Sequence, residues 1–105
     1  GGTFSHAILK RPAHGDFRVQ EFLGGSESGT DCPEGAQDLA VQARQAAEQI
    51  LDTETLLYTR ADMLRDADGR FRLMELELIE PSLFFGHAAD GGDLFATGVN
   101  AALPR

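Results

Sequence analysis

Hydrophobic and polar residues alternate along this chain in short runs that predict four β-strands. These runs cover residues 3–10, 17–23, 55–64 and 70–79, and turn-forming residues separate them. A period of two is typical of strands with one buried face, because successive side chains point to opposite sides. The segments RPAHGD (11–16) and DADG (66–69) carry turn chemistry, so the strands are expected to form two consecutive hairpins.

Between the two hairpins the pattern changes to a helical period. From Pro33 to Leu51, apolar residues recur at helical spacing and predict one amphipathic helix, while GGSESGTD (24–31) is interpreted as a flexible loop. A second, shorter helix is expected within 88–103, where glycines interrupt the pattern. This order predicts an α+β fold in which a mainly antiparallel sheet is covered on one face by helices.

Length and charge restrict the possible functions. The 105 residues suffice for one small domain, 1–105, and the formal net charge of -8 argues against binding a nucleic-acid backbone. No apolar run reaches membrane-spanning length, so no membrane contact is expected. The single cysteine excludes an internal disulfide, which fits a cytoplasmic location. The chain begins Gly-Gly without an initiating Met and is interpreted as a piece of a longer protein.

The stretch LMELELIEPSLFF (73–85) places carboxylates inside an apolar strand. Glu75 and Glu77 share one face of that strand, about 7 Å apart at the Cα level. A four-residue turn at DADG would pair Arg60 with Glu75 and Asp62 with Leu73 on the preceding strand. Three carboxylates and one arginine would then lie on a single face.

Clustered carboxylates repel one another unless a positive charge lies among them. Arg60 offsets one negative charge, and a divalent cation such as Mg²⁺ or Mn²⁺ would offset more, since hard cations prefer oxygen ligands. The alternative is a solvated acidic face with a cross-strand pair between Arg60 and Glu75, which contributes little to stability. The residues by themselves leave both interpretations open.

The block YTRADMLRDADGRFRLMELELIEPS (58–82) resembles the C-terminal part of ATP-grasp ligases, in particular the branch of glutathione synthetase and cycloserine-forming ligases. In that family a strand Asp is followed across a hairpin by Glu-x-Asn, and then by a Pro. Asp62, Glu75 and Pro81 match this pattern. Glu77 stands where many members carry Asn, which makes the expected metal site more acidic.

A second block, FSHAILKRPAHGDFRVQEFLGG (4–25), resembles the family's strand with Asp-x-Arg, matched by Asp16 and Arg18. The resemblance implies a ligase that uses ATP to phosphorylate a small carboxylate substrate, after which an amine attacks the acyl phosphate. It implies that Asp62, Glu75 and Glu77 hold Mg²⁺ or Mn²⁺. It also implies that Arg18 and Glu75 bind ATP, while Arg18 and Arg60 stabilise the transferring group.

The family grips ATP with a preceding subdomain that carries strand lysines and a glycine-rich lid, and this chain contains neither. The resemblance therefore implies that the rest of an ATP-grasp chain is its partner, that the chain alone is inactive, and that exposed apolar surface could make it a homo-oligomer. Two other functions stay open: a non-enzymatic acidic binding or dimerisation module, and a different metal-dependent phosphotransfer or hydrolytic enzyme.

Other polar residues give weaker signals. His6, His14 and His87 are too scattered in the sequence to indicate a metal triad. Lys10 lies at the end of a predicted strand, where a charge usually only interacts with solvent, and Ser82 is interpreted as part of a simple turn.

Overall fold

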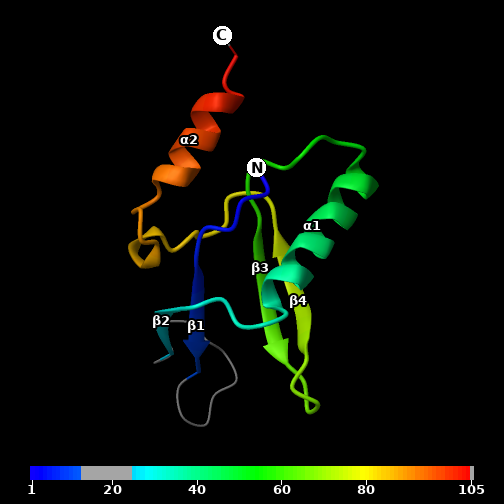
Figure 1. Ribbon diagram of the computed structural model, residues 1–105, viewed down its shortest axis with the longest axis vertical. Helices are drawn as coiled ribbons and strands as arrows, with labels where there is room; N and C mark the ends of the chain where they lie inside the picture. Colours follow the sequence, from blue (N-terminus) through cyan, green and yellow to red (C-terminus); the bar gives the residue numbers. More distant parts are fainter. Residues whose placement is uncertain (13–24, 105) are drawn as a thin grey trace.

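The computed structural model describes residues 1–12 and 25–104, which form an α+β fold with two small antiparallel sheets (Figure 1). The elements in chain order are β1 (Ala7–Arg11), β2 (Ser26–Thr30), α1 (Ala36–Leu51), β3 (Arg60–Arg65), β4 (Phe71–Glu77), the 3-10 helix η2 (Phe85–His87) and α2 (Asp93–Ala102). The predicted fold class is confirmed, although the described strands form two sheets of two strands each.

The turn between β3 and β4 lies at the predicted DADG segment. The amide of Gly69 donates to the carbonyl of Asp66 at 3.0 Å, and the amide of Asp66 donates to the carbonyl of Arg70 at 2.8 Å. Gly69 has φ +80°, a left-handed conformation that glycine adopts without steric cost. The local turn chemistry therefore sets where the hairpin reverses.

The predicted register of this hairpin is wrong by two residues at its open end. Arg60 lies opposite Glu77 and Asp62 lies opposite Glu75, whereas next to the turn Arg65 lies opposite Phe71. The register shifts between Asp62 and Met63, because β4 carries one extra residue there in a β-bulge. Bulges depend on how the whole sheet twists, so the alternating pattern did not predict this one.

Helix α1 packs across β4 and, to a smaller extent, β3. It begins at Ala36, three residues after the predicted start. Gly35, at its N-cap, has a left-handed φ of 83°, which a helix cannot continue through. At the other end, the guanidinium of Arg44 and the amide of Leu56 both donate to the carboxylate of Glu48. These bonds join the last turns of α1 to the loop that leads into β3.

The interpretation of residues 24–31 as a flexible loop is wrong, since β2 occupies most of that segment. Ile8 on β1 lies opposite Gly29 on β2, and Leu9 lies opposite Ser28. Pairing with a distant strand decided this structure, because the segment itself is rich in glycine and serine. The predicted strand at 17–23, and its pairing with β1, lie outside the described residues.

The segment after β4 connects both sheets to α2. The ring of Phe95 on α2 contacts the rings of Tyr58 and Phe85, with centroids 5.5 and 5.3 Å apart. A ring nitrogen of His6, beside β1, lies 2.6 Å from the carbonyl oxygen of Leu83. Within the described ranges no side chain is fully buried, and no helix has the length and apolar character needed to cross a membrane.

Candidate metal centre

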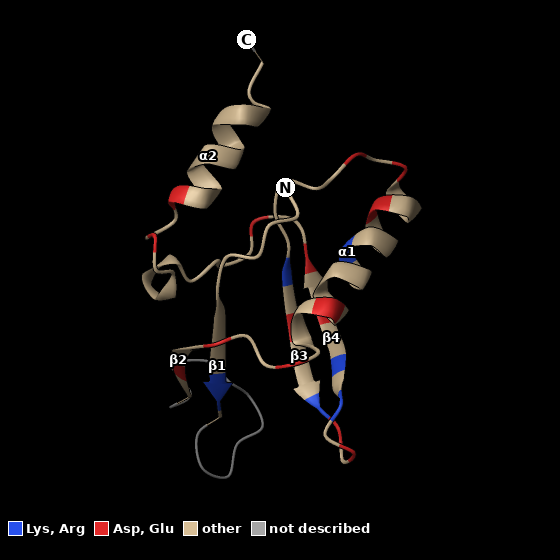
Figure 2. Cartoon of the chain, in the orientation of Figure 1, with Lys and Arg blue, Asp and Glu red and all other residues tan. Residues whose placement is uncertain are grey.

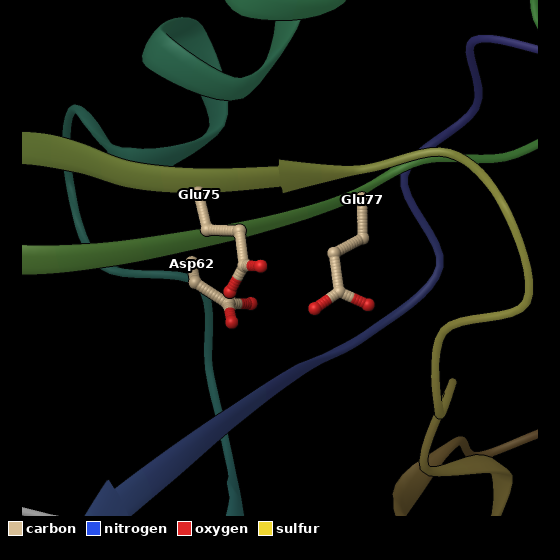
Figure 3. A group of neighbouring side chains, drawn as sticks. All are labelled: Asp62, Glu75 and Glu77. Atoms are coloured by element: carbon tan, nitrogen blue, oxygen red, sulfur yellow. The ribbon is translucent and has the colours of Figure 1, made fainter.

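Strands β3 and β4 carry both acidic and basic residues (Figure 2). Three of their carboxylates converge on one side of the hairpin (Figure 3). Asp62 comes from β3, and Glu75 and Glu77 come from β4. Each offers one oxygen atom within 4.8 Å of the others, and these three residues are called the acidic cluster below. Small rotations of these side chains would let all three oxygen atoms contact one cation.

The bulge explains why the cluster forms although the predicted register is wrong. A shift of one residue would move a strand's side chains to the opposite face. Near the turn the observed pairing differs from the predicted one by one residue, and the bulge at Met74 adds a second. A total shift of two residues keeps Glu75 and Glu77 on the face of Asp62, and it brings Glu75 directly opposite Asp62.

Arg60 provides the positive charge nearest to the acidic cluster among the described residues. Its Nε and Nη2 donate to the two carboxylate oxygens of Asp62, each at 2.9 Å. Nη2 also donates to Oε1 of Glu77 at 2.9 Å. Because both partners are charged, these hydrogen bonds belong to the strong class, and the two-pronged pair with Asp62 fixes the plane of the guanidinium.

The acidic cluster also changes the protonation equilibrium of Arg60. The pKa of Arg60 is raised above its usual range, chiefly because Asp62 accepts its hydrogen bonds and further because the other two carboxylates lie close. Partial burial of the guanidinium works in the opposite direction and is outweighed. The carboxylates therefore hold Arg60 in its charged form.

A loop after β4 holds the other side of the guanidinium. Nη1 of Arg60 donates to the carbonyl oxygen of Ser82 at 3.0 Å, and the guanidinium carbon lies 5.6 Å from the ring centre of Phe84. The ammonium of Lys10 lies 4.6 Å from the same ring centre. Phe84 has a left-handed φ of 51°, a conformation that costs energy in a residue with a side chain. The loop thus brings two cations toward one aromatic ring beside the acidic cluster.

The donor set of the acidic cluster fits a hard divalent cation. All three groups are carboxylates, and Mg²⁺ and Mn²⁺ prefer oxygen ligands over nitrogen or sulfur. The side chains of Asp62 and Glu77 keep 30% and 27% of their surface exposed, so water or a phosphate oxygen can complete the coordination. Mg²⁺ characteristically keeps several such outer ligands.

The structure brings together four of the five residues predicted to form the site. Asp62, Glu75 and Glu77 form the acidic cluster, and Arg60 is bonded to it. The expected cross-strand pair of Arg60 with Glu75 is not present, since Glu77 stands opposite Arg60. Arg18, like its neighbour Asp16, lies outside the described residues, so its predicted role stays a prediction.

Phe84 and the carbonyl of Ser82 are additions that the sequence did not indicate. Strand β4 ends at Glu77, and the turn predicted around Ser82, after Pro81, is the loop that returns to Arg60. A backbone carbonyl leaves no signal in the sequence. The aromatic pair Phe84–Phe85, three residues after Pro81, was a visible hint that this loop packs against other residues.

Neither protein-family models nor curated proteins match this chain. Among solved structures, it is similar to the crystal structure of D-cycloserine synthetase DcsG, with a TM-score of 0.84 and 30% sequence identity over 98% of this chain. The chain matches a segment of an ATP-grasp ligase. It spans 35% of the length of that synthetase chain.

The ATP-grasp match agrees with the resemblance stated from residues 4–25 and 58–82 and with the predicted branch of the family. It extends over nearly the whole chain, so α1, α2 and both strand pairs belong to the matched segment. The acidic cluster therefore lies on a hairpin that has a counterpart in an ATP-grasp ligase.

Proposed function

We propose that this chain supplies the metal- and phosphate-binding part of an ATP- and Mg²⁺-dependent ligase, which joins a small carboxylate to an amine or a related nucleophile through an acyl phosphate. The observation that carries the proposal is the convergence of Asp62, Glu75 and Glu77 within the segment that matches an ATP-grasp ligase. The rest of an ATP-grasp chain would supply the remaining contacts with ATP and the two substrates.

In this proposal the acidic cluster holds one or two Mg²⁺ ions through carboxylate oxygens. The bound metal would neutralise negative charge on the phosphates of ATP during phosphoryl transfer. Glu75, opposite Asp62, is placed to share a cation with it. Glu77 would keep one oxygen near Arg60 and offer the other to the metal.

The arginines are proposed to act on the transferring phosphoryl group. Arg60 is a permanent cation at the edge of the acidic cluster, where negative charge develops as the acyl phosphate forms. Arg18 is proposed to contact the phosphates, as the resemblance implies. A positive charge that is in place before the chemical step stabilises the transition state with little reorganisation during that step.

The proposal is tested by titrating the intact protein with Mn²⁺ and following paramagnetic broadening of its amide NMR signals, with and without ATP. We expect broadening centred on Asp62, Glu75 and Glu77 that strengthens when ATP is added. Substitution Glu75→Gln is expected to weaken Mn²⁺ binding about tenfold or more, because one charged ligand is lost.

Glu54→Gln is the matched control, since it removes one negative charge from an exposed position in the loop between α1 and β3. It is expected to leave Mn²⁺ binding unchanged. Broadening spread over all acidic residues, with equal effects of Glu54→Gln and Glu75→Gln, would contradict the metal centre. That result would favour the non-enzymatic acidic module.

A further inference from the structure

Arg60 has two separate sets of partners on opposite sides of its guanidinium. One set is Asp62 and Glu77, which take three hydrogen bonds from Nε and Nη2. The other set is the carbonyl of Ser82, which takes a bond from Nη1, and the ring of Phe84. The first set consists of proposed metal ligands, whereas the second contains none.

The first set of bonds uses the oxygen atoms that a cation would need. Both oxygens of Asp62 and one oxygen of Glu77 accept hydrogen bonds from Arg60 at 2.9 Å. A divalent cation bound to these carboxylates withdraws electron density from the same oxygens and repels the guanidinium at short range. Arg60 and the cation therefore compete for Asp62.

We propose that Arg60 is an exchangeable counter-ion of the metal centre, which gives up Asp62 when a divalent cation binds and remains attached to the loop through Ser82 and Phe84. This inference rests on the proposed function, since it requires the acidic cluster to bind metal. The loop anchor keeps the released guanidinium beside the cluster.

The exchange makes the loop after β4 sensitive to metal. Before the cation binds, the guanidinium of Arg60 joins the acidic cluster to the carbonyl of Ser82. After the exchange, Nε and Nη2 are free to donate to an anionic group on the metal, such as a phosphate oxygen. Binding of the cation thus prepares Arg60 for an anion that binds next.

The first test measures Mn²⁺ affinity by calorimetry in the intact protein, without ATP, for the wild type, Arg60→Gln and Arg60→Lys. Removal of the competing guanidinium is expected to tighten Mn²⁺ binding about tenfold in Arg60→Gln, the equivalent of about one lost charge-assisted hydrogen bond. Arg60→Lys keeps the charge but loses the two-pronged geometry, so it is expected to be intermediate.

Arg65→Gln is the control, because it removes the same charge from the same strand at an exposed position. It is expected to change Mn²⁺ affinity far less than Arg60→Gln does. Unchanged or weaker binding in Arg60→Gln, with normal binding in the wild type, would overturn the exchange and leave the metal centre standing. Binding in none of the variants would overturn both proposals.

A second measurement needs no substitution at Arg60. The Nε–H signal of Arg60 is followed by NMR while Mg²⁺ is added to the wild-type protein. Loss of the bond to Asp62 is expected to shift this signal and to speed its exchange with solvent, and Glu75→Gln is expected to move both effects to higher Mg²⁺. An Nε–H signal that stays unchanged while Mg²⁺ shifts the amides of Asp62 and Glu75 would overturn the exchange.

Discussion

Individual carboxylates in this chain have different roles, which depend on the hydrogen bonds that each accepts. Asp66 holds the β3–β4 turn: one oxygen accepts from the amides of Asp68 and Arg70, and the other accepts from Nε of Arg72 at 2.8 Å. These bonds, that of Arg72 first, hold the pKa of Asp66 below its ordinary value. Asp62 is also an aspartate, but it faces the carboxylates of Glu75 and Glu77 and is therefore proposed to bind a cation.

The lowered pKa of Asp66 predicts a pH dependence of stability. As pH falls, the unfolded chain takes up the proton first, because its carboxyl has the higher pKa. The stabilisation by Asp66 is therefore complete above the unfolded value of 3.8 and is lost as pH falls through the folded pKa. We expect Asp66→Asn to destabilise the protein near neutral pH and to flatten the loss of stability below about pH 4.

Urea unfolding of both proteins between pH 2 and 6 measures this effect. Asp68→Asn is the control, since it lies in the same turn and its carboxylate accepts none of the hydrogen bonds found within residues 1–12 and 25–104. Equal pH dependence in the wild type and Asp66→Asn would contradict the role given to Asp66.

At the scale of elements, the β3–β4 hairpin illustrates how a correct face can follow from an incorrect register. Alternation placed Glu75 and Glu77 on the face of Asp62, and the structure confirms that placement. The cross-strand pairing of β3 with β4 was predicted incorrectly, because the alternating pattern does not show the extra residue of the β-bulge in β4. Strand β2 was missed for a related reason, since its partner strand decides its conformation.

The hairpin turn also provides a stability prediction. Gly69 has φ +80° with open space around the position of a Cβ atom, so Gly69→Ala would introduce backbone strain without a collision. We expect a loss of about 1–2 kcal/mol in the free energy of unfolding, measured by chemical denaturation. Gly86→Ala, also in open space but without a positive φ, is expected to be nearly neutral or slightly stabilising. Equal effects of the two substitutions would contradict this explanation.

The whole molecule exposes more surface than a compact chain of its length. Its radius of gyration is 14.9 Å, compared with about 13 Å for a compact domain of 105 residues. Its accessible surface is 7876 Å², whereas a compact monomer of this mass exposes roughly 5,700 Å². Ile50 and Ile79 keep 84% and 85% of their surface exposed. We infer that the remainder of an ATP-grasp chain covers part of this surface.

This inference predicts the behaviour of the chain when it is expressed alone. Exposed apolar surface is expected to bind the dye ANS and to drive association that increases with concentration in sedimentation velocity. The double substitution Ile50→Ser and Ile79→Ser is expected to reduce both effects, because within residues 1–12 and 25–104 these are the two most exposed large apolar side chains. A compact monomer without ANS binding would contradict the inference.

The sequence by itself determined what depends on near neighbours in the chain. The two-residue period put Glu75 and Glu77 on one face of a strand, and the DADG turn placed the strand that carries Asp62 beside them. Helix α1 followed from its apolar stripe. Each of these features depends on local geometry, which a few consecutive residues specify.

The tertiary structure decided what depends on residues far apart in the chain. It set the bulge that brings Glu75 opposite Asp62, and it brought the carbonyl of Ser82 and the ring of Phe84 to Arg60. It also turned residues 26–30 into a strand. These outcomes come from packing and from backbone hydrogen bonds between distant segments, whose energies no local pattern contains.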